Sequence, residues 1–216
     1  MLLPSESIQS YFDQLAIASK LEIDDTQRHR LLAFVALLHK WNKAYNLTSV
    51  RDPKDMVTRH IFDSIMVTPH LQGQVIADVG TGPGLPGIPL AIMSPNRKFV
   101  LIDSLGKRIR FIRQVIYELK LTNVEAIQNR VEQVEIPDGA DMVVSRAFAS
   151  IKDMLHWCQH LVNSDGCFCA LKGQLDPSEL SAVPDGFCID QHLAINVPGL
   201  DAQRHIVYIN KTSVID

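Results

Sequence analysis

A glycine-rich turn between two apolar segments constrains the fold more than any other feature of this chain. The β-branched run Val75–Val79 is long enough for one buried strand. An apolar segment over residues 88–92 then supplies one face of a helix. Between them lie four glycines, Gly80, Gly82, Gly84 and Gly87. Glycine allows the backbone to approach a ligand closely, and a helix N-terminus offers free N–H groups. The order strand, glycine turn, helix predicts the first half of a nucleotide-binding βαβ unit.

The glycine spacing favours a methyl-donor nucleotide over a dinucleotide. Read from the strand end, Leu85 stands where the dinucleotide fingerprint G-x-G-x-x-G wants its third glycine. The register Gly82-x-Gly84-x-x-Gly87 fits that fingerprint but begins too far past Val79. The pattern Asp78-x-Gly80-x-Gly82-x-Gly84 instead resembles motif I of the S-adenosylmethionine-dependent methyltransferases. In that interpretation Asp78 holds water or the amino group of the cofactor.

A second acidic residue follows the next predicted strand. Residues 98–102 predict a strand, and Asp103 comes directly after it, about twenty residues past the glycines. An acidic side chain at this place hydrogen-bonds the two ribose hydroxyls of an adenosine. Asp103 alone does not separate the methyl donor from a dinucleotide. A helix cap is the competing role, although Ser104 can also serve as that cap.

The remaining pattern predicts a helical extension ahead of an alternating α/β domain. Residues 1–72 show helical periodicity without a strand signal, with helix caps expected at Thr26 and Asp52. Residues 73–216 alternate strands and helices and end in two strand-like runs that suit an antiparallel hairpin. We expect an α/β fold of the class I S-adenosylmethionine-dependent methyltransferase type: Rossmann-like, with a mostly parallel sheet that ends in the hairpin.

Composition excludes several classes of function. No apolar run reaches the roughly 18 residues of a membrane span, and the N-terminus does not read as a secretion signal. The four cysteines have no framework spacing, so we expect a reducing, cytoplasmic location. The histidines and cysteines lack the spacing of a zinc site, and we expect no metal. A net charge of −3 means that any contact with RNA depends on a local patch.

The carboxyl ends of the predicted strands carry the candidate site, because ligands of doubly wound sheets bind there. Val131 and Glu132 are placed to flank the adenine of the cofactor. Amino-group methyltransferases carry an Asp/Asn-Pro-Pro-aromatic motif where this chain has Ser145–Arg146. Enzymes that methylate C5 of pyrimidines need a nucleophilic cysteine near that loop, and none stands there.

This set of residues, which contains no general base for the target, fits a target atom that is nucleophilic without deprotonation. The N7 of guanine has a free lone pair and no proton to lose, so it requires no general base. In-line positioning and hydrogen-bond donors near guanine O6 suffice. Arg146 is the first candidate donor and Lys172 the second. The competing interpretation of Arg146 is a structural ion pair.

One predicted helix carries a basic patch in an unfavourable place. Lys107, Arg108 and Arg110 occupy its first turns, where cations oppose the helix dipole by a few tenths of a kcal/mol each. A cost without local benefit indicates binding of RNA phosphates, and Arg113 extends the same surface. The alternative to RNA binding is that these residues form an ordinary solvent-exposed face of the helix.

Six segments in the right order resemble a known family. They are Trp41–Thr48, Arg59–Ser64, Asp78–Gly87, Asp103–Arg108, Ser145–Ala149 and Ala170–Gly173. The chain resembles the ribosomal RNA small subunit methyltransferase G family, also called glucose-inhibited division protein B. The resemblance implies transfer of a methyl group from S-adenosylmethionine to N7 of guanine 527 in 16S rRNA. It also implies a list of residues in contact with the cofactor: Gly80, Leu85, Val131, Glu132 and Arg146.

The resemblance leaves two other functions to be weighed and several details open. Asn46, His60 and Asp63 of the helical extension would shape the pocket or serve as buried structural groups. A non-catalytic sensor of S-adenosylmethionine is the alternative from another class, and an NAD-dependent dehydrogenase is the third. The expected partner is 16S rRNA or the small ribosomal subunit, with the protein acting as a monomer.

Overall fold

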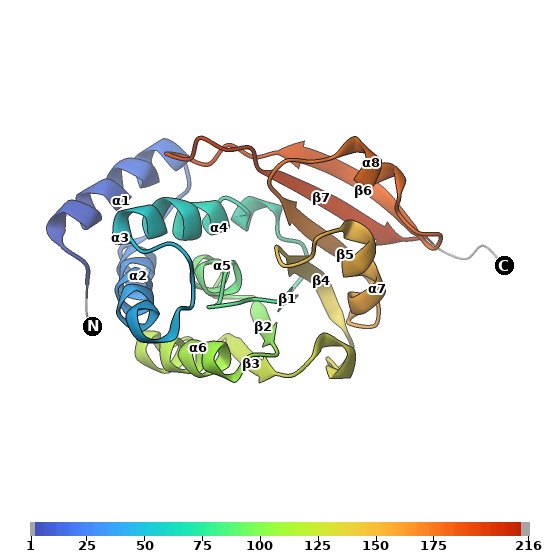
Figure 1. The fold of residues 1–216 in the computed structure, drawn as a ribbon, viewed down its shortest axis with the longest axis horizontal. Helices are drawn as coiled ribbons and strands as arrows, with labels where there is room; N and C mark the ends of the chain where they lie inside the picture. The colour runs from blue at the N-terminus through green and yellow to red at the C-terminus, as the bar shows by residue number, and fades with distance from the viewer. Residues whose placement is uncertain (1–2, 213–216) are drawn as a thin grey trace.

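The computed structural model describes residues 3–212 (Figure 1). The predicted limits 1–72 and 73–216 of the two parts therefore include residues 1, 2 and 213–216, which lie outside the described residues. Within the described part, no helix is both long and apolar enough to cross a membrane.

The first part of the chain is helical, as the periodicity predicts. Its elements are α1 (Glu6–Ser19), α2 (Asp25–Tyr45), α3 (Pro53–Met56), the π-helix η1 (Val57–Phe62), α4 (Asp63–Ile65) and the 3-10 turn η2 (Thr68–His70). The cap of α2 differs from the prediction. Asp24, not Thr26, precedes the helix, and it forms a capping box in which its Oδ1 accepts from Gln27 N at 2.8 Å. The predicted cap at Asp52 is confirmed.

A seven-stranded sheet forms the rest of the molecule, in the order β3-β2-β1-β4-β5-β7-β6. Only β7 runs antiparallel to its neighbours β5 and β6, so the sheet is mostly parallel and ends in the predicted hairpin. The elements are β1 (Val75–Val79), α5 (Gly87–Met93), β2 (Lys98–Asp103), α6 (Gly106–Leu119), β3 (Val124–Gln128), η3 (Val131–Gln133), β4 (Ala140–Ser145), α7 (Ile151–Cys158), β5 (Val162–Lys172), α8 (Pro177–Ser181), β6 (Phe187–Ala194) and β7 (His205–Lys211). This confirms the α/β class.

The sheet is buried on both faces because successive strand residues point to opposite sides. In β2, Phe99 and Leu101 pack in a cluster with α5 and α6, whereas Val100 and Ile102 pack on the other face with α7. Figure 1 shows α1 to α4 gathered beside α5 and α6, away from α7 and α8. Both faces of the central strands are thus covered, and only the strand ends are open to ligands.

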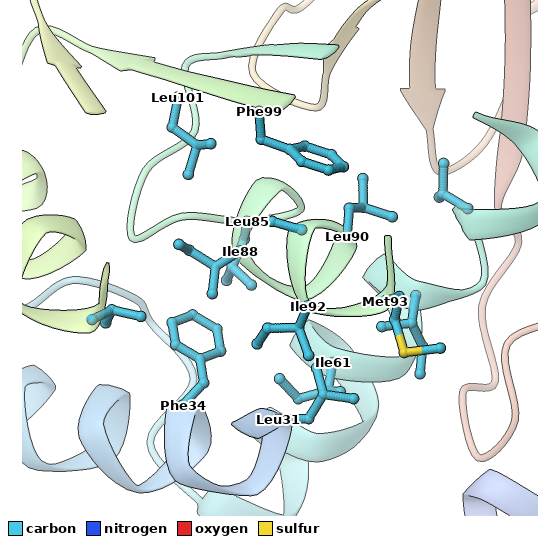
Figure 2. Packing of buried hydrophobic residues seen from close by; sticks show 14 of the residues in the cluster. Leu31, Phe34, Ile61, Leu85, Ile88, Leu90, Ile92, Met93, Phe99 and Leu101 are labelled. Carbon is cyan, nitrogen blue, oxygen red and sulfur yellow. The ribbon is translucent and has the colours of Figure 1, made fainter. Parts of the chain in front are cut away.

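The helical extension shares its core with the sheet. Figure 2 shows Leu31 and Phe34 of α2 facing Ile88 and Ile92 of α5, and all four side chains are at most 1% exposed. The same cluster continues to Phe99 of β2. Full burial of such a side chain is worth about 1.5–3 kcal/mol. The extension is therefore packed onto α5, directly behind the glycine turn.

Candidate active site

The glycine turn holds the end of β1 close to both neighbouring strands. The amides of Gly80 and Thr81 donate to Ile102 O of β2, at 2.9 and 3.1 Å. Gly80 has φ +69°, and a Cβ on it would lie 2.4 Å from Cβ of Ala147, just past β4. Gly82 has φ +60° and open space around its Cβ position. Glycine is required at Gly80 for both backbone conformation and close approach.

The side chain of Asp78 holds this turn in place through two hydrogen bonds. Its side chain is 1% exposed, and its Oδ2 accepts from Thr81 Oγ1 at 2.7 Å and from Gly87 N at 2.8 Å. The first N–H of α5 is therefore bound by Asp78, and our expectation that it is free for a ligand is wrong. Burial raises the pKa of Asp78 from 3.8 to about 6, against the lowering effect of these two hydrogen bonds. Direct contact between Asp78 and the cofactor stays a prediction.

A cavity of about 340 Å³ lies beyond the carboxyl ends of β1, β2 and β3. Its lining includes four of the predicted cofactor residues: Gly80, Asp103, Val131 and Glu132. Ile102, Ala147 and Phe148 supply apolar walls. An apolar cavity with a few acidic and backbone groups is the usual form of a nucleoside site.

The carboxylate of Asp103 is only partly satisfied by the protein. Its Oδ1 accepts from Leu105 N at 2.9 Å, and its Oδ2 accepts from Gly82 N and from Arg108, each at 3.0 Å. Two carboxylate oxygens offer about four acceptor positions, so one remains for a ribose hydroxyl. Leu105 precedes the first residue of α6, so its hydrogen bond to Asp103 holds the turn into the helix, and no side-chain hydrogen bond caps α6.

Two other predicted cofactor residues have a packing role. Leu85 is 5% exposed and points into the core beside Ile88 (Figure 2). Gly84 has φ +89°, and a Cβ on it would lie 2.5 Å from Ile88 Cγ1. Neither residue lines the cavity. Their backbone shapes the turn, and their contact with the cofactor stays a prediction.

A second cavity of about 320 Å³ contains both candidate catalytic residues, Arg146 and Lys172. Arg146 lines this cavity, whereas its neighbour Ala147 lines the first one. The two cavities therefore lie on either side of the turn that follows β4. Nζ of Lys172 forms an ion pair with Glu179 at 2.6 Å and donates to Ala149 O at 3.1 Å.

Asp63 links two arginines at the second cavity. Its Oδ2 accepts from Arg146 at 3.0 Å and its Oδ1 from Arg204 Nε at 2.5 Å. The side chain of Asp63 is 5% exposed, whereas the two arginines are 27% and 28% exposed. The predicted ion pair of Arg146 exists, but its partner is shared. Sequence reasoning missed Arg204 altogether, because it belongs to no motif and only the pairing of β7 with β5 brings it beside Lys172.

The π-helix η1 places His60 next to this group. π-helical turns are rare and often occur at functional sites. His60 is 8% exposed, and its Nε2 lies 2.9 Å from Thr48 Oγ1. Burial, together with the charge of Arg146, lowers the pKa of His60 from 6.5 to about 4. The ring is therefore neutral at physiological pH.

The predicted RNA-binding residues divide into two places. Arg110 and Arg113 are exposed on α6, and Nζ of Lys107 donates to Tyr45 O at the end of α2, at 3.1 Å. The α6 patch thus adjoins the C-terminal end of α2. Arg108 instead pairs with Asp103 and lines the first cavity. Its assignment to RNA stays a prediction, and its contacts favour a place beside the cofactor.

The three buried cysteines, Cys158, Cys167 and Cys169, are unsuited to nucleophilic chemistry. Burial raises the pKa of Cys158 to about 12 and that of Cys167 to about 11, so both remain thiols. Within residues 3–212, no group of three or more His, Cys, Asp or Glu side chains is arranged to hold a metal ion.

Comparisons with known proteins identify a family and a fold. The family model described as "rRNA small subunit methyltransferase G" matches residues 27–207. A relative of that name from Shewanella amazonensis is 58% identical over 191 residues, which cover 88% of this chain and 93% of the relative. Another from Idiomarina loihiensis is 56% identical, with 96% of this chain and 99% of the relative covered.

Solved structures with low sequence identity share the fold. A SAM-dependent methyltransferase from Aquifex aeolicus superposes with a TM-score of 0.54 at 16% identity, covering 79% of this chain and 96% of that one. Coclaurine N-methyltransferase bound to N-methylheliamine and SAH gives a TM-score of 0.55 at 14% identity, covering 90% and 69%. These likenesses show the class I methyltransferase fold and nothing finer.

Proposed function

We propose that this chain, which belongs to the rRNA small subunit methyltransferase G family, methylates N7 of guanine 527 in 16S rRNA. It is an S-adenosylmethionine-dependent methyltransferase. The observation that carries the target proposal is the pair of cavities on either side of the turn after β4. One has the acid and apolar walls of a nucleoside site, and the other has guanidinium donors.

The residues of the first cavity fit the cofactor. Asp103 retains an acceptor position for a ribose hydroxyl, Gly80 lines the cavity, and Val131 and Glu132 line it where they would flank the adenine. When bound, S-adenosylmethionine supplies a methyl group on a positively charged sulfur. The lining carries two carboxylates, Asp103 and Glu132, and two guanidinium groups, Arg108 and Arg130.

The chemistry asks little of the protein beyond positioning. In this transfer the lone pair of guanine N7 would form the new N–C bond while the C–S bond of the donor would break, with the electron pair of that bond remaining on sulfur. No proton moves, so no side chain has to act as a base, and neutral His60 and buried Asp78 are not needed for proton transfer. The turn from Ser145 to Ala147 separates the two cavities and is held in place, because Ser145 Oγ donates to Val79 O at 2.7 Å and accepts from Ala147 N at 3.0 Å.

Small ribosomal subunits from cells that lack this gene provide the test. The protein and labelled S-adenosylmethionine should yield one 7-methylguanosine per subunit, located by mass spectrometry. A methyl group on another atom would refute the assignment to N7. Cofactor binding without any transfer, to subunits or to naked 16S rRNA, would favour the sensor instead. Family membership favours the enzyme.

The cellular setting follows from this substrate. We propose that the protein acts as a monomer in the cytoplasm, on an assembled small subunit. A structured particle fits the net charge of −3, because RNA is then held by a local patch such as that on α6 and not by the overall field.

A further inference from the structure

The second cavity joins three segments that are far apart in the chain. Asp63 comes from α4 in the helical extension, Arg146 from the end of β4, and Arg204 from the residue before β7. Backbone bonds fix Arg204 in place, because Ile195 N donates to Arg204 O at 2.8 Å. Arg204 is thus held at both its backbone and its head group, and Arg146 at its head group.

Both carboxylate oxygens of Asp63 accept hydrogen bonds from these arginines, and each arginine retains further N–H donors. Each guanidinium carries five N–H donors, and the bonds to Asp63 use one on each. One N–H of the Arg204 Nη1 group donates to its neighbour Gln203 O at 2.8 Å. The rest of both head groups lies in the wall of a cavity whose other walls include the apolar Val67, Leu171 and Ile195.

The chemistry of this cavity matches one edge of a purine. Apolar walls accept a flat ring, and fixed donors demand acceptors on its rim. Guanine presents O6 and N7 as neighbouring acceptors, whereas adenine presents an N6 amino donor in the O6 position. Arg204 lines the second cavity but not the first, so it lies on the target side.

We infer that Arg204 is a specificity-determining residue that donates to O6 of the target guanine, and that Asp63 is a positioning residue that holds Arg204 and Arg146 together. The inference rests on the proposed function. A single donor to O6 orients the base and leaves N7 free for the methyl group. Two guanidiniums this close repel each other, and the shared carboxylate keeps them at one site.

The test measures methyl transfer to small subunits by Arg204→Ala, with the dissociation constant of S-adenosylmethionine alongside. We expect kcat/KM to fall by about 5- to 150-fold, as for loss of one good base contact, and cofactor affinity to stay unchanged. The variant Arg204→Lys keeps the charge but loses the planar fork, so it should recover little of the rate. It also serves if the alanine variant folds poorly.

The dependence of KM on salt separates a base contact from a phosphate contact. Losing a phosphate contact makes the slope of log affinity against log salt shallower by about 1, whereas losing a base contact leaves it unchanged. An unchanged slope with reduced rate supports the inference. A shallower slope, or an unchanged rate, overturns the assignment to O6. Failure of the wild-type protein to methylate subunits would instead refute the proposed function.

A double-mutant cycle that combines substitutions of Asp63 and Arg204 tests the role of Asp63. If Asp63 acts through Arg204, Asp63→Asn lowers the rate of the wild type but has a much smaller effect in the Arg204→Ala background. Equal effects in both backgrounds overturn the positioning role. Arg28 and Asp13 provide matched controls, because they form a similar pair at 2.6 Å between α1 and α2. Arg28→Ala should leave transfer unchanged.

Discussion

The buried carboxylate of Asp78 lowers the stability of the protein as the pH rises. The substitution Asp78→Asn should abolish this pH dependence. Burial disfavours the ionised form, so the folded protein binds a proton more tightly than the unfolded chain. The stability from this group is fully present below pH 3.8 and is lost as the pH rises to about 6. Asparagine is neutral at every pH and shows no such loss.

The expected size follows from the two pKa values. With 3.8 in the unfolded and about 6 in the folded state, ionisation of Asp78 costs about 1 kcal/mol at pH 4.5. At pH 7.5 the cost is about 3 kcal/mol, since one pKa unit corresponds to ~1.4 kcal/mol. The free energy of unfolding of the variant minus that of the wild type should therefore increase by about 2 kcal/mol over this range.

Urea unfolding between pH 4.5 and 7.5, followed by tryptophan fluorescence, measures this difference. Comparing the two proteins cancels the titration of His60 and of the other groups. A difference that stays constant within about 0.5 kcal/mol would refute the reasoning. Thr81→Val is the complementary variant: it removes the 2.7 Å hydrogen bond that lowers the pKa of Asp78, so the pH dependence should extend to higher pH.

Three further predictions concern the turn, the sheet and the basic patch. Gly80→Ala should abolish cofactor binding in isothermal titration, because its φ of +69° and the Ala147 contact leave no room for a Cβ. Asp141→Ala should lower the free energy of unfolding in urea by about 2–3 kcal/mol, because Asp141 Oδ2 accepts from Gln74 N and Val75 N at the start of β1. Lys107→Ala combined with Arg110→Ala should raise KM for small subunits and make its salt slope shallower by about 1.5, at unchanged kcat.

Each of these has an outcome that would contradict it. Wild-type cofactor affinity in Gly80→Ala would mean that the turn can rearrange. An Asp141→Ala protein as stable as the wild type would show that water replaces the carboxylate; at low pH the two proteins should converge, because the backbone donors lower the pKa of Asp141. For the basic patch, Lys98→Ala on β2 is the control. An equal change in the salt dependence of KM in this variant would contradict a specific role of α6 in RNA binding.

Local patterns accounted for most of the fold and for the first cavity. The glycine turn, the acid after β2 and the alternation of strands and helices are signals carried by neighbouring residues. They place Gly80 and Asp103 at one cavity, because the carboxyl ends of adjacent parallel strands meet at one edge. Short-range signals also explain the error at Thr26, because the nearby Asp24 is the residue that accepts from the backbone N–H of Gln27.

The second cavity was largely out of reach, because its contacts are long-range. Asp63 and Arg204 lie 141 positions apart, and nothing in either segment signals the other. The π-helix that carries His60 has the same apolar periodicity as an ordinary helix, so it is not visible in the sequence either. Arg146 and Lys172 were found from strand ends and Asp63 was named from the family resemblance, but the pairing of Asp63 with both arginines was not predicted.

The position of β7 affects how this protein is made. Although β7 is the last strand in the chain, it lies between β5 and β6 in the sheet, so β6 has no partner until residues 205–211 have been synthesised. Arg204 arrives with the same segment. A nascent chain that stops short of it exposes the edges of β5 and β6, which other chains can pair with. Premature termination or a ribosomal pause just before β7 should therefore produce an aggregation-prone intermediate that binds chaperones and has no finished target cavity.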